Sequence, residues 1–180
     1  MTCVWRRSVG TAHIPHNVLL FCSILFSDTA PLDDAQSALK NSFGEFVYKS
    51  EPISFDFTSY YEEELGSPLY RVLLAFDTLM HRDCIPAVKN RTNEIEIELL
   101  REGKRTVNLD PGILSLENVS LATTKPYSHR IYIKEGIWAE VTLIYRNKSY
   151  QALEWTYPDY ASPKLIRIFH DLRKIYKGRL

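Results

Sequence analysis

Residues of the types that bind anions and transfer protons are concentrated between Arg105 and Tyr160, in sequence that otherwise reads as short strands and tight turns. Lys125, His129 and Arg130 are close enough in the chain to converge on one phosphate or carboxylate group. A carboxylate beside them would act as a general acid or base. These residues therefore predict a site for a small anionic ligand, such as a nucleotide or a phosphorylated metabolite.

The candidate residues divide into two sets by the chemistry of their side chains. The candidate catalytic residues are Glu140, His129 and Asp110. The candidate ligand-binding residues are Lys125, Arg130, Asn108 and Asp159. Whether a reaction is catalysed stays open at the level of the sequence, because the same side chains have structural uses. An exposed arginine–glutamate pair is a common surface feature, and aspartate before Pro-Gly commonly starts a turn.

No established metal or nucleotide motif accompanies these residues. No two histidines have the spacing of metal ligands, so a dedicated metal site is not predicted. A magnesium ion, if one bound, would use the carboxylates of Asp110, Glu140 and Asp159. The phosphate-cradling loop G-x-x-x-x-G-K-[ST] and the dinucleotide pattern G-x-G-x-x-G are both absent, which excludes a P-loop GTPase.

The balanced charge of the chain argues against a nucleic-acid or membrane partner. Lysine plus arginine and aspartate plus glutamate each number 22, so no overall field attracts a polyanion. A length of 180 residues with 45% hydrophobic residues suits one domain with a single core. The three cysteines are widely spaced, which suits a reducing compartment. We expect a cytoplasmic protein with a loose extension at residues 1–16 and a single α+β domain at residues 17–180.

The order of predicted elements indicates a ferredoxin-like split βαβ core, in which two helices cover one face of an antiparallel sheet. The apolar run 18–26 has the length of a buried strand, so we favour a strand over a secretory signal there. A β-hairpin and a C-terminal helix that begins at Ser162 and Pro163 extend this core. The predicted order is a strand at 18–26, a helix ending near 43, strands at 46–57 and 70–79, a helix at 83–100, and strands at 106–109 and 119–123.

The hairpin at residues 129–145 sets the relation between two candidate site residues. A three-residue loop at 134–136, with its glycine in the left-handed conformation, turns Ile131 and Ile133 toward the core. The opposite face then pairs Arg130 with Glu140 across the strands. The strand at 106–109 is expected to end at a turn formed by Asp110, Pro111 and Gly112.

Five segments carry a resemblance to a known family: Phe55–Tyr61, Val107–Gly112, Leu121–Lys125, His129–Tyr132 and Trp155–Tyr160. In this order they are similar to segments of the prokaryotic family catalogued as domain of unknown function 4416. The resemblance spans about residues 18–177 and implies no mechanism, because the family itself is uncharacterised. Members that resemble this chain are sometimes labelled GTP-binding proteins, and this chain departs from that label because it lacks the phosphate loop.

A second function class is also open, namely a non-catalytic protein-interaction module. In that interpretation the acidic loop 60–64 and the aromatic segment 155–160 form a docking surface for another protein. Geometry separates the two hypotheses. A ligand site should be concave, whereas a docking surface should be exposed and flat, with Arg130 and Glu140 merely paired.

Overall fold

The computed structural model describes residues 10–180. Residues 10–17 have exposed side chains and form neither helix nor strand. The rest of the extension predicted at residues 1–16 lies outside the described residues.

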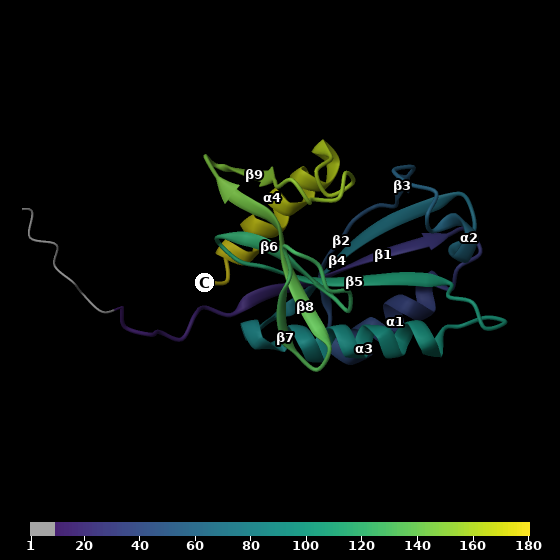
Figure 1. Ribbon diagram of the computed structural model, residues 1–180, viewed down its shortest axis with the longest axis horizontal. Coiled ribbons are helices and arrows are strands. Elements are labelled where there is room, and N and C mark those ends of the chain that lie inside the picture. The colour runs from purple at the N-terminus through teal and green to yellow at the C-terminus, as the bar shows by residue number, and fades with distance from the viewer. Residues whose placement is uncertain (1–9) are drawn as a thin grey trace, which may run out of the picture.

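One antiparallel sheet forms the centre of the fold (Figure 1). Its strand order is β2-β4-β1-β5-β6-β8-β7, with β3 also paired to β4 and β9 paired to β8. The strand predicted at 46–57 is two short strands, and β9 was not predicted. The strands are β1 (Val18–Ser27), β2 (Phe46–Lys49), β3 (Ile53–Phe55), β4 (Leu69–Met80), β5 (Val107–Leu114), β6 (Asn118–Thr123), β7 (Ile131–Lys134), β8 (Ile137–Arg146) and β9 (Ser149–Ala152).

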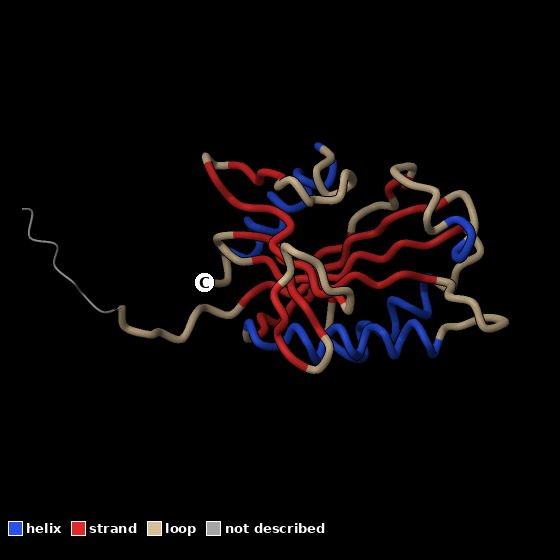
Figure 2. Tube along the Cα trace, in the orientation of Figure 1, coloured by secondary structure: helices blue, strands red, loops and turns tan. Residues whose placement is uncertain are grey.

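Helices cover both faces of the sheet (Figure 2). Helices α1 (Leu32–Phe43) and α3 (Ile85–Glu98) pack on one face, where alternate residues of β1 such as Leu20 and Ile24 are buried. Helix α4 (Pro163–Lys177) packs on the other face against Phe21. The shortest helices are α2 (Glu62–Leu65) and the 3-10 turn at Arg82–Cys84. Among the described residues, no helix combines the length and apolar character needed to cross a membrane.

The predicted α+β class is confirmed, but the sheet is larger than predicted. Two helices on one face were expected, and α1 and α3 are found there. Helix α4 covers the second face and begins as predicted, since the Ser162 side chain accepts a hydrogen bond from the Leu165 backbone N–H.

The sheet divides between β5 and β6. Strand β5 pairs with β1 from Val107 to Leu114, but with β6 only from Gly112 to Leu114. Figure 1 shows β8 crossing β5 at a steep angle beyond this point. At the division, α3 takes the place of a neighbouring strand. The Glu96 carboxylate accepts the Leu109 N–H, and Lys89 Nζ donates to the Leu109 carbonyl at 2.8 Å.

The turn predicted at Asp110, Pro111 and Gly112 is wrong, because β5 continues through all three residues. Backbone groups alternate in direction along a strand, so the nitrogen of Pro111 faces the same side as the outward N–H of Leu109. On that side β6 has not yet joined the ladder. The missing N–H of proline therefore costs no strand–strand hydrogen bond.

Gly112 is required by close packing rather than by a turn. A Cβ atom at this position would lie 2.4 Å from the Phe21 ring and 2.6 Å from the Ser120 carbonyl oxygen. We expect Gly112→Ala to lower the free energy of unfolding by about 2–3 kcal/mol, because the backbone carbonyl cannot yield as a flexible side chain would. Urea denaturation measures this change. Gly103→Ala, at a position with open space but positive φ, is the comparison for a purely conformational cost.

The β7–β8 hairpin has a shorter loop than predicted. Ile131 pairs with Ala139, but the register then shifts so that Lys134 pairs with Ile137. The loop is therefore Glu135–Gly136, with φ values of 54° and 77°. Positive φ at both central residues is typical of the two-residue hairpin turn that matches strand twist.

The exposure of this hairpin differs from the prediction, although Ile137, on the same face as Ile131, is buried in a cluster with Ile85 of α3. Ile131 and Ile133 are 70% and 43% exposed, whereas Glu140 is 3% exposed. Strand β7 is the last strand of the sheet path, so no further strand flanks it on that side. Glu140 lies opposite Leu121 of β6, which in turn lies opposite Gly112 of β5. Glu140 therefore belongs to the face that α4 covers.

Candidate functional site

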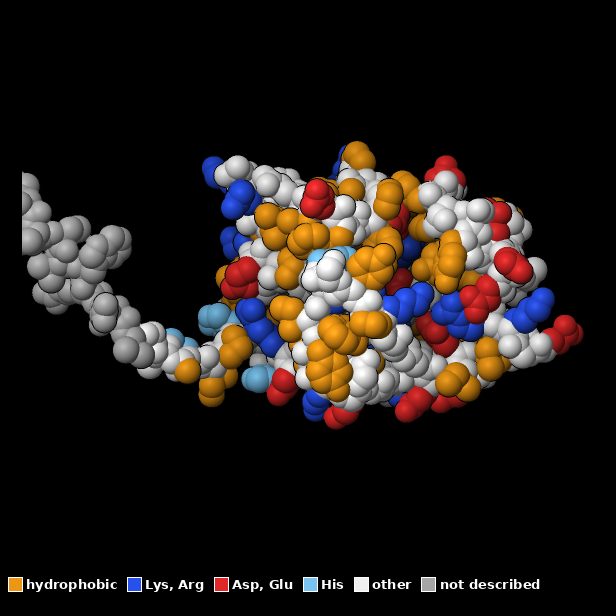
Figure 3. Space-filling model, in the orientation of Figure 1, with side chains coloured by type: hydrophobic (Ala, Val, Ile, Leu, Met, Phe, Trp, Pro, Cys, Tyr) orange, Lys and Arg blue, Asp and Glu red, His pale blue; other side chains and the backbone are white. Residues whose placement is uncertain are grey.

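Polar side chains gather on the α4 face of the sheet, beside the division between β5 and β6. In the register, Ser23 lies opposite Asp110, and Leu25 lies opposite both Arg71 and Asn108. All these side chains point to the face on which α4 packs. Figure 3 shows a hollow near the middle of the visible surface, with acidic and basic side chains at its bottom and hydrophobic groups on either side.

Tyr61 defines the space above these residues. Burial raises the pKa of Tyr61 to about 12, and the charge of Asp110 and the Tyr157 hydroxyl add to this effect, which Arg71 partly offsets. Groups from β4, from β5 and from the segment before α4 therefore lie near Tyr61 at the start of α2. We call the region between Tyr61, Arg71, Asp110 and Tyr157 the recess, and we include Lys125 because its Nζ lies 5.7 Å from the ring of Tyr60, which packs on Tyr61.

A buried ion pair lies at the bottom of the recess. Arg71 Nη2 lies 2.8 Å from Asp159 Oδ2, and each side chain is 6% exposed. Arg71 Nη1 donates a hydrogen bond to the Ser23 hydroxyl. The Arg71 guanidinium also lies against the rings of Phe55 and Tyr160, at 5.1 and 5.2 Å from their centroids.

The geometry of this ion pair leaves polar atoms unsatisfied. The 2.8 Å contact is not aligned as a hydrogen bond, so within the described residues Asp159 Oδ2 and Arg71 Nε have no hydrogen-bond partner, and neither has the Tyr160 hydroxyl. A cavity of about 10 Å³ beside Arg71 and Asp159 is roughly the volume that one water molecule needs. Burial raises the pKa of Asp159 despite the opposing effect of Arg71.

Asp110 stands at the side of the recess without a counter-ion. It is half-buried, and within residues 10–180 it takes part in no ion pair. The Asn108 side-chain amide donates to Asp110 Oδ2 at 2.8 Å, and Arg105 in turn donates to Asn108 Oδ1 at 3.0 Å. This carboxylate therefore keeps free acceptor positions that a ligand can use.

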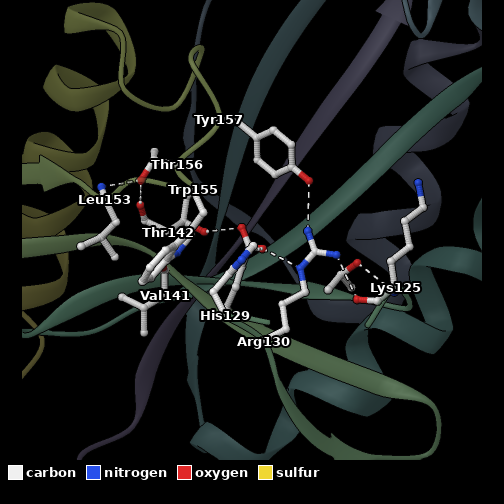
Figure 4. Close-up of polar contacts among 11 residues, drawn as sticks. Lys125, His129, Arg130, Val141, Thr142, Leu153, Trp155, Thr156 and Tyr157 are labelled. Carbon is white, nitrogen blue, oxygen red and sulfur yellow. Dashed lines mark hydrogen bonds and ion pairs between the residues drawn. The ribbon is translucent and has the colours of Figure 1, made fainter. Parts of the chain in front are cut away.

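The predicted pair of Arg130 and Glu140 is present, and it is buried rather than exposed. Arg130 Nε lies 2.8 Å from Glu140 Oε2, with side-chain exposures of 7% and 2%. His129 Nε2 lies 3.1 Å from the same oxygen, and the Thr142 hydroxyl donates to Oε1 at 3.4 Å. Figure 4 shows His129 and Arg130 side by side, with Arg130 between Lys125 and Tyr157. We call His129, Arg130 and Glu140 the Glu140 cluster.

Arg130 is not an open fork for an anion, contrary to the prediction. Each of its three nitrogens is engaged: Nε with Glu140, Nη1 with the Lys125 carbonyl at 2.9 Å, and Nη2 with the Tyr157 hydroxyl at 3.1 Å. Its hydrogen bonds join the turn before β7 to the segment before α4. The arginine therefore holds one side of the recess in place.

His129 is held as firmly as Arg130. Its ring stacks on Trp155 with centroids 4.9 Å apart and an angle of 11° between the planes. Trp155 itself is fixed by its indole N–H, which donates to the Val141 carbonyl at 2.9 Å. His129 lies in the turn before β7 and not in the strand itself. Glu140 occupies Nε2, so Nδ1 is the ring nitrogen through which His129 could exchange a proton with a ligand.

Lys125 is the candidate cation that stays available. Its side chain is exposed, and Nζ lies 5.7 Å from the centroid of the Tyr60 ring. Within the described residues, Lys125 Nζ forms no ion pair, although it contributes with Arg105 to lowering the pKa of Glu64. Its backbone carbonyl, by contrast, is used by Arg130.

The structure brings six of the seven candidate residues into three groups, and the Lys125 side chain lies apart from them over the Tyr60 ring. His129, Arg130 and Glu140 lie together, Asn108 lies with Asp110, and Asp159 lies at the bottom of the recess with Arg71. The magnesium site considered for Asp110, Glu140 and Asp159 does not form. In the described chain, no three His, Cys, Asp or Glu side chains are grouped closely enough to hold a metal ion.

Sequence reasoning missed several residues that shape the recess. Arg71 was one, although it is the lone charged side chain in the apolar run from Leu69 to Phe76. That pattern is a usable signal, because an arginine inside a buried strand requires a partner. Arg105 and Tyr61 carried no comparable signal.

A larger hollow elsewhere contains none of the candidate residues. It has a volume of about 460 Å³ and lies where β1 leads into α1. Its charged lining groups are all acidic, which does not suit an anionic ligand. They are Asp28, Asp33 and Asp34.

The chain belongs to the family described as "Domain of unknown function (DUF4416)", whose sequence profile matches residues 16–176. The match includes every candidate site residue and all of the sheet, so the resemblance seen in the sequence is confirmed. No curated protein and no solved structure matches the chain. The family description assigns no function.

Proposed function

We propose that the recess binds a small anionic ligand, a phosphorylated metabolite or nucleotide, with Lys125 as the cation for its acidic group and Asp110 as the acceptor for its hydroxyl or amino groups. One observation carries the proposal. Lys125 and Asp110 are unpaired charges of opposite sign on one recess, within the described residues. The half-buried Asp110 carboxylate favours a ligand that supplies a hydrogen-bond donor, and the exposed Lys125 is free to meet the acidic group of that ligand.

Aromatic residues at the rim support the same proposal. Tyr60 is 66% exposed and Tyr157 is 47% exposed. Tyr60 packs edge-on against Tyr61 with centroids 5.0 Å apart, which orients both rings. Exposed, oriented rings of this kind offer faces to a ligand that carries a ring of its own.

The roles proposed for the remaining candidates change with the geometry. The Glu140 cluster becomes the wall that positions Tyr157, and Asn108 becomes the group that orients Asp110. Asp110 is the one candidate acid–base residue whose oxygen atoms are free to reach a ligand. If the protein is an enzyme, Asp110 is the residue to which we assign proton transfer.

The proposal predicts that Lys125→Met weakens ligand binding by about 10- to 100-fold, because a charge-assisted hydrogen bond to an anion contributes about 1.5–3 kcal/mol. Calorimetric titration measures this, after a thermal-shift screen of inorganic phosphate, sugar phosphates and nucleotides selects the tightest compound. Asp110→Asn should weaken the same compound if it carries donor groups.

Lys177→Met is the matched control, since Lys177 is an exposed lysine in the last turn of α4. It should bind as the parent protein does. Two outcomes contradict the proposal: no compound raises the melting temperature of the parent, or Lys125→Met and Lys177→Met bind equally well.

A second candidate function is the protein-interaction module, with the acidic loop 60–64 and the aromatic segment 155–160 as its surface. It is favoured by the exposure of Tyr60 and Tyr157 and by the fact that Arg130 and Glu140 are paired. The same screen tests it. Stabilisation by any small anion that Lys125→Met abolishes contradicts this second candidate.

We also infer a ferredoxin-like split βαβ core and a cytoplasmic location. The neighbouring strands β2, β4, β1 and β5 are antiparallel, and α1 and α3 lie on one face of them, which supports the split βαβ arrangement. The free thiols of Cys22 and Cys84 support a reducing compartment.

A further inference from the structure

Arg105 connects three elements around the recess. Its Nε and Nη2 bind both carboxylate oxygens of Glu64 on α2, at 2.6 and 2.5 Å. Its Nη1 donates to Glu96 of α3 at 3.2 Å and to Asn108 of β5 at 3.0 Å. A bidentate arginine–carboxylate contact fixes the relative orientation of the two side chains as well as the distance between them.

The bond to Arg105 decides which way the Asn108 amide points. Because Asn108 Oδ1 accepts from Arg105, its Nδ2 faces Asp110 and donates to Oδ2 at 2.8 Å. The reversed amide would set donors against the guanidinium and an oxygen against the Asp110 carboxylate. Both contacts would then be repulsive, so Arg105 selects the orientation that presents a donor to Asp110.

Helix α2 depends on contacts outside itself. It has a single turn, with hydrogen bonds from Leu65 N to Tyr61 O at 2.8 Å and from Gly66 N to Glu62 O at 3.0 Å. A helix this short is unstable alone. Leu65 and Tyr61 pack against Phe55 of β3, and the Glu64–Arg105 pair ties α2 to the segment before β5. The charge of Asp110 acts on Tyr61, which lies at the start of this turn.

We infer that Arg105 is a positioning residue that holds α2, and with it Tyr61, at the recess while it orients Asp110 through Asn108. The role of the recess as a ligand site rests on the proposed function, whereas the positioning by Arg105 does not. Arg105 thus positions both α2 and Asp110, which lie on two sides of the recess. An anionic ligand that competes for the guanidinium would loosen both sides at once.

The experiment is nuclear magnetic resonance on the full chain without ligand, comparing the parent with Arg105→Met. Two signals are read: the side-chain amide protons of Asn108, and the hydrogen exchange of the Leu65 and Gly66 backbone amides. In Arg105→Met we expect the Asn108 amide signals to shift, and the two backbone amides to exchange about fivefold faster, as the loss of about 1 kcal/mol predicts.

Two further variants separate the contact of Arg105 with Glu64 from its contact with Asn108. Glu64→Gln should speed exchange in α2 and leave the Asn108 amide signals in place, because Glu96 still holds Arg105. Asn108→Ala should leave α2 exchange at the parent rate. Arg105→Lys keeps the charge without the fork, and it replaces Arg105→Met if that variant does not fold. We expect it to shift the Asn108 signals too.

The inference is overturned if Arg105→Met, or Arg105→Lys in its place, leaves the Asn108 signals unchanged, or if the exchange of β1 amides rises as much as that of α2. The second result would show a general loss of packing. None of these readouts needs a ligand. A failure of Lys125 to bind any anion would therefore contradict the proposed function and leave this inference standing.

Discussion

Arg71→Met should lower the free energy of unfolding by about 3–5 kcal/mol, because it leaves the Asp159 carboxylate buried without its counter-charge. Methionine keeps most of the packing against Phe55 and Tyr160, so the loss reports the charge and not an empty space. Urea denaturation at neutral pH measures the effect. The double variant Arg71→Met/Asp159→Leu should recover much of the loss, since it removes both buried charges.

The deficit of Arg71→Met should shrink as the pH falls. Burial already raises the pKa of Asp159, so the folded protein holds this proton more tightly than the unfolded chain. Stability from the neutral carboxyl is therefore fully present below the unfolded pKa, and it is lost as the pH rises through the folded pKa. Without Arg71 that pKa rises further. A deficit that is equal at pH 5 and pH 7.5 would contradict this account.

Glu140→Leu should cost a similar amount, about 3–5 kcal/mol, because the Arg130 guanidinium would stay buried without an anion. The effect should be visible as a lower midpoint of urea denaturation. Glu140→Gln should cost less, since the amide oxygen still accepts from Arg130 and His129. We expect the urea midpoint to be highest for the parent protein, lower for Glu140→Gln and lowest for Glu140→Leu.

The double variant Arg130→Met/Glu140→Leu is the control for the pair. It should be more stable than Glu140→Leu alone, because it leaves no isolated charge. If Glu140→Leu alone stays within about 1 kcal/mol of the parent, the pair behaves as an exposed surface pair would. The assignment of the Glu140 cluster as a fixed wall of the recess would then be wrong.

The sequence predicted correctly those helices and strands whose formation depends on neighbouring residues in the chain. The apolar run from Val18 to Phe26 is a buried strand, and Ser162 with Pro163 begins α4. The turn predicted at Asp110–Gly112 is wrong because residues far away in the chain keep this stretch in β5. Side chains of α3 form hydrogen bonds with the main chain of Leu109 in β5. The sequence near residue 110 contains no pattern that predicts these contacts.

The candidate site was predicted only where its partners share a hairpin. Arg130 and Glu140 meet because two strands joined by a short loop must pair, although their burial was not foreseen. Arg71 and Asp159 come from β4 and from the segment before α4, far apart in the chain. Their meeting depends on the strand order and on the placement of α4, which the sequence pattern does not specify.

The way α3 completes β5 also bears on self-association. An unpaired stretch of strand is an open template that another chain can extend by strand invasion. Here the Leu109 main-chain groups are already bonded to Lys89 and Glu96, two buried side chains of α3. The gap between β5 and β6 thus leaves room for polar side chains, but the main-chain groups of Leu109 are not free to bond to a strand of another chain. We therefore expect no self-association by strand pairing at this gap.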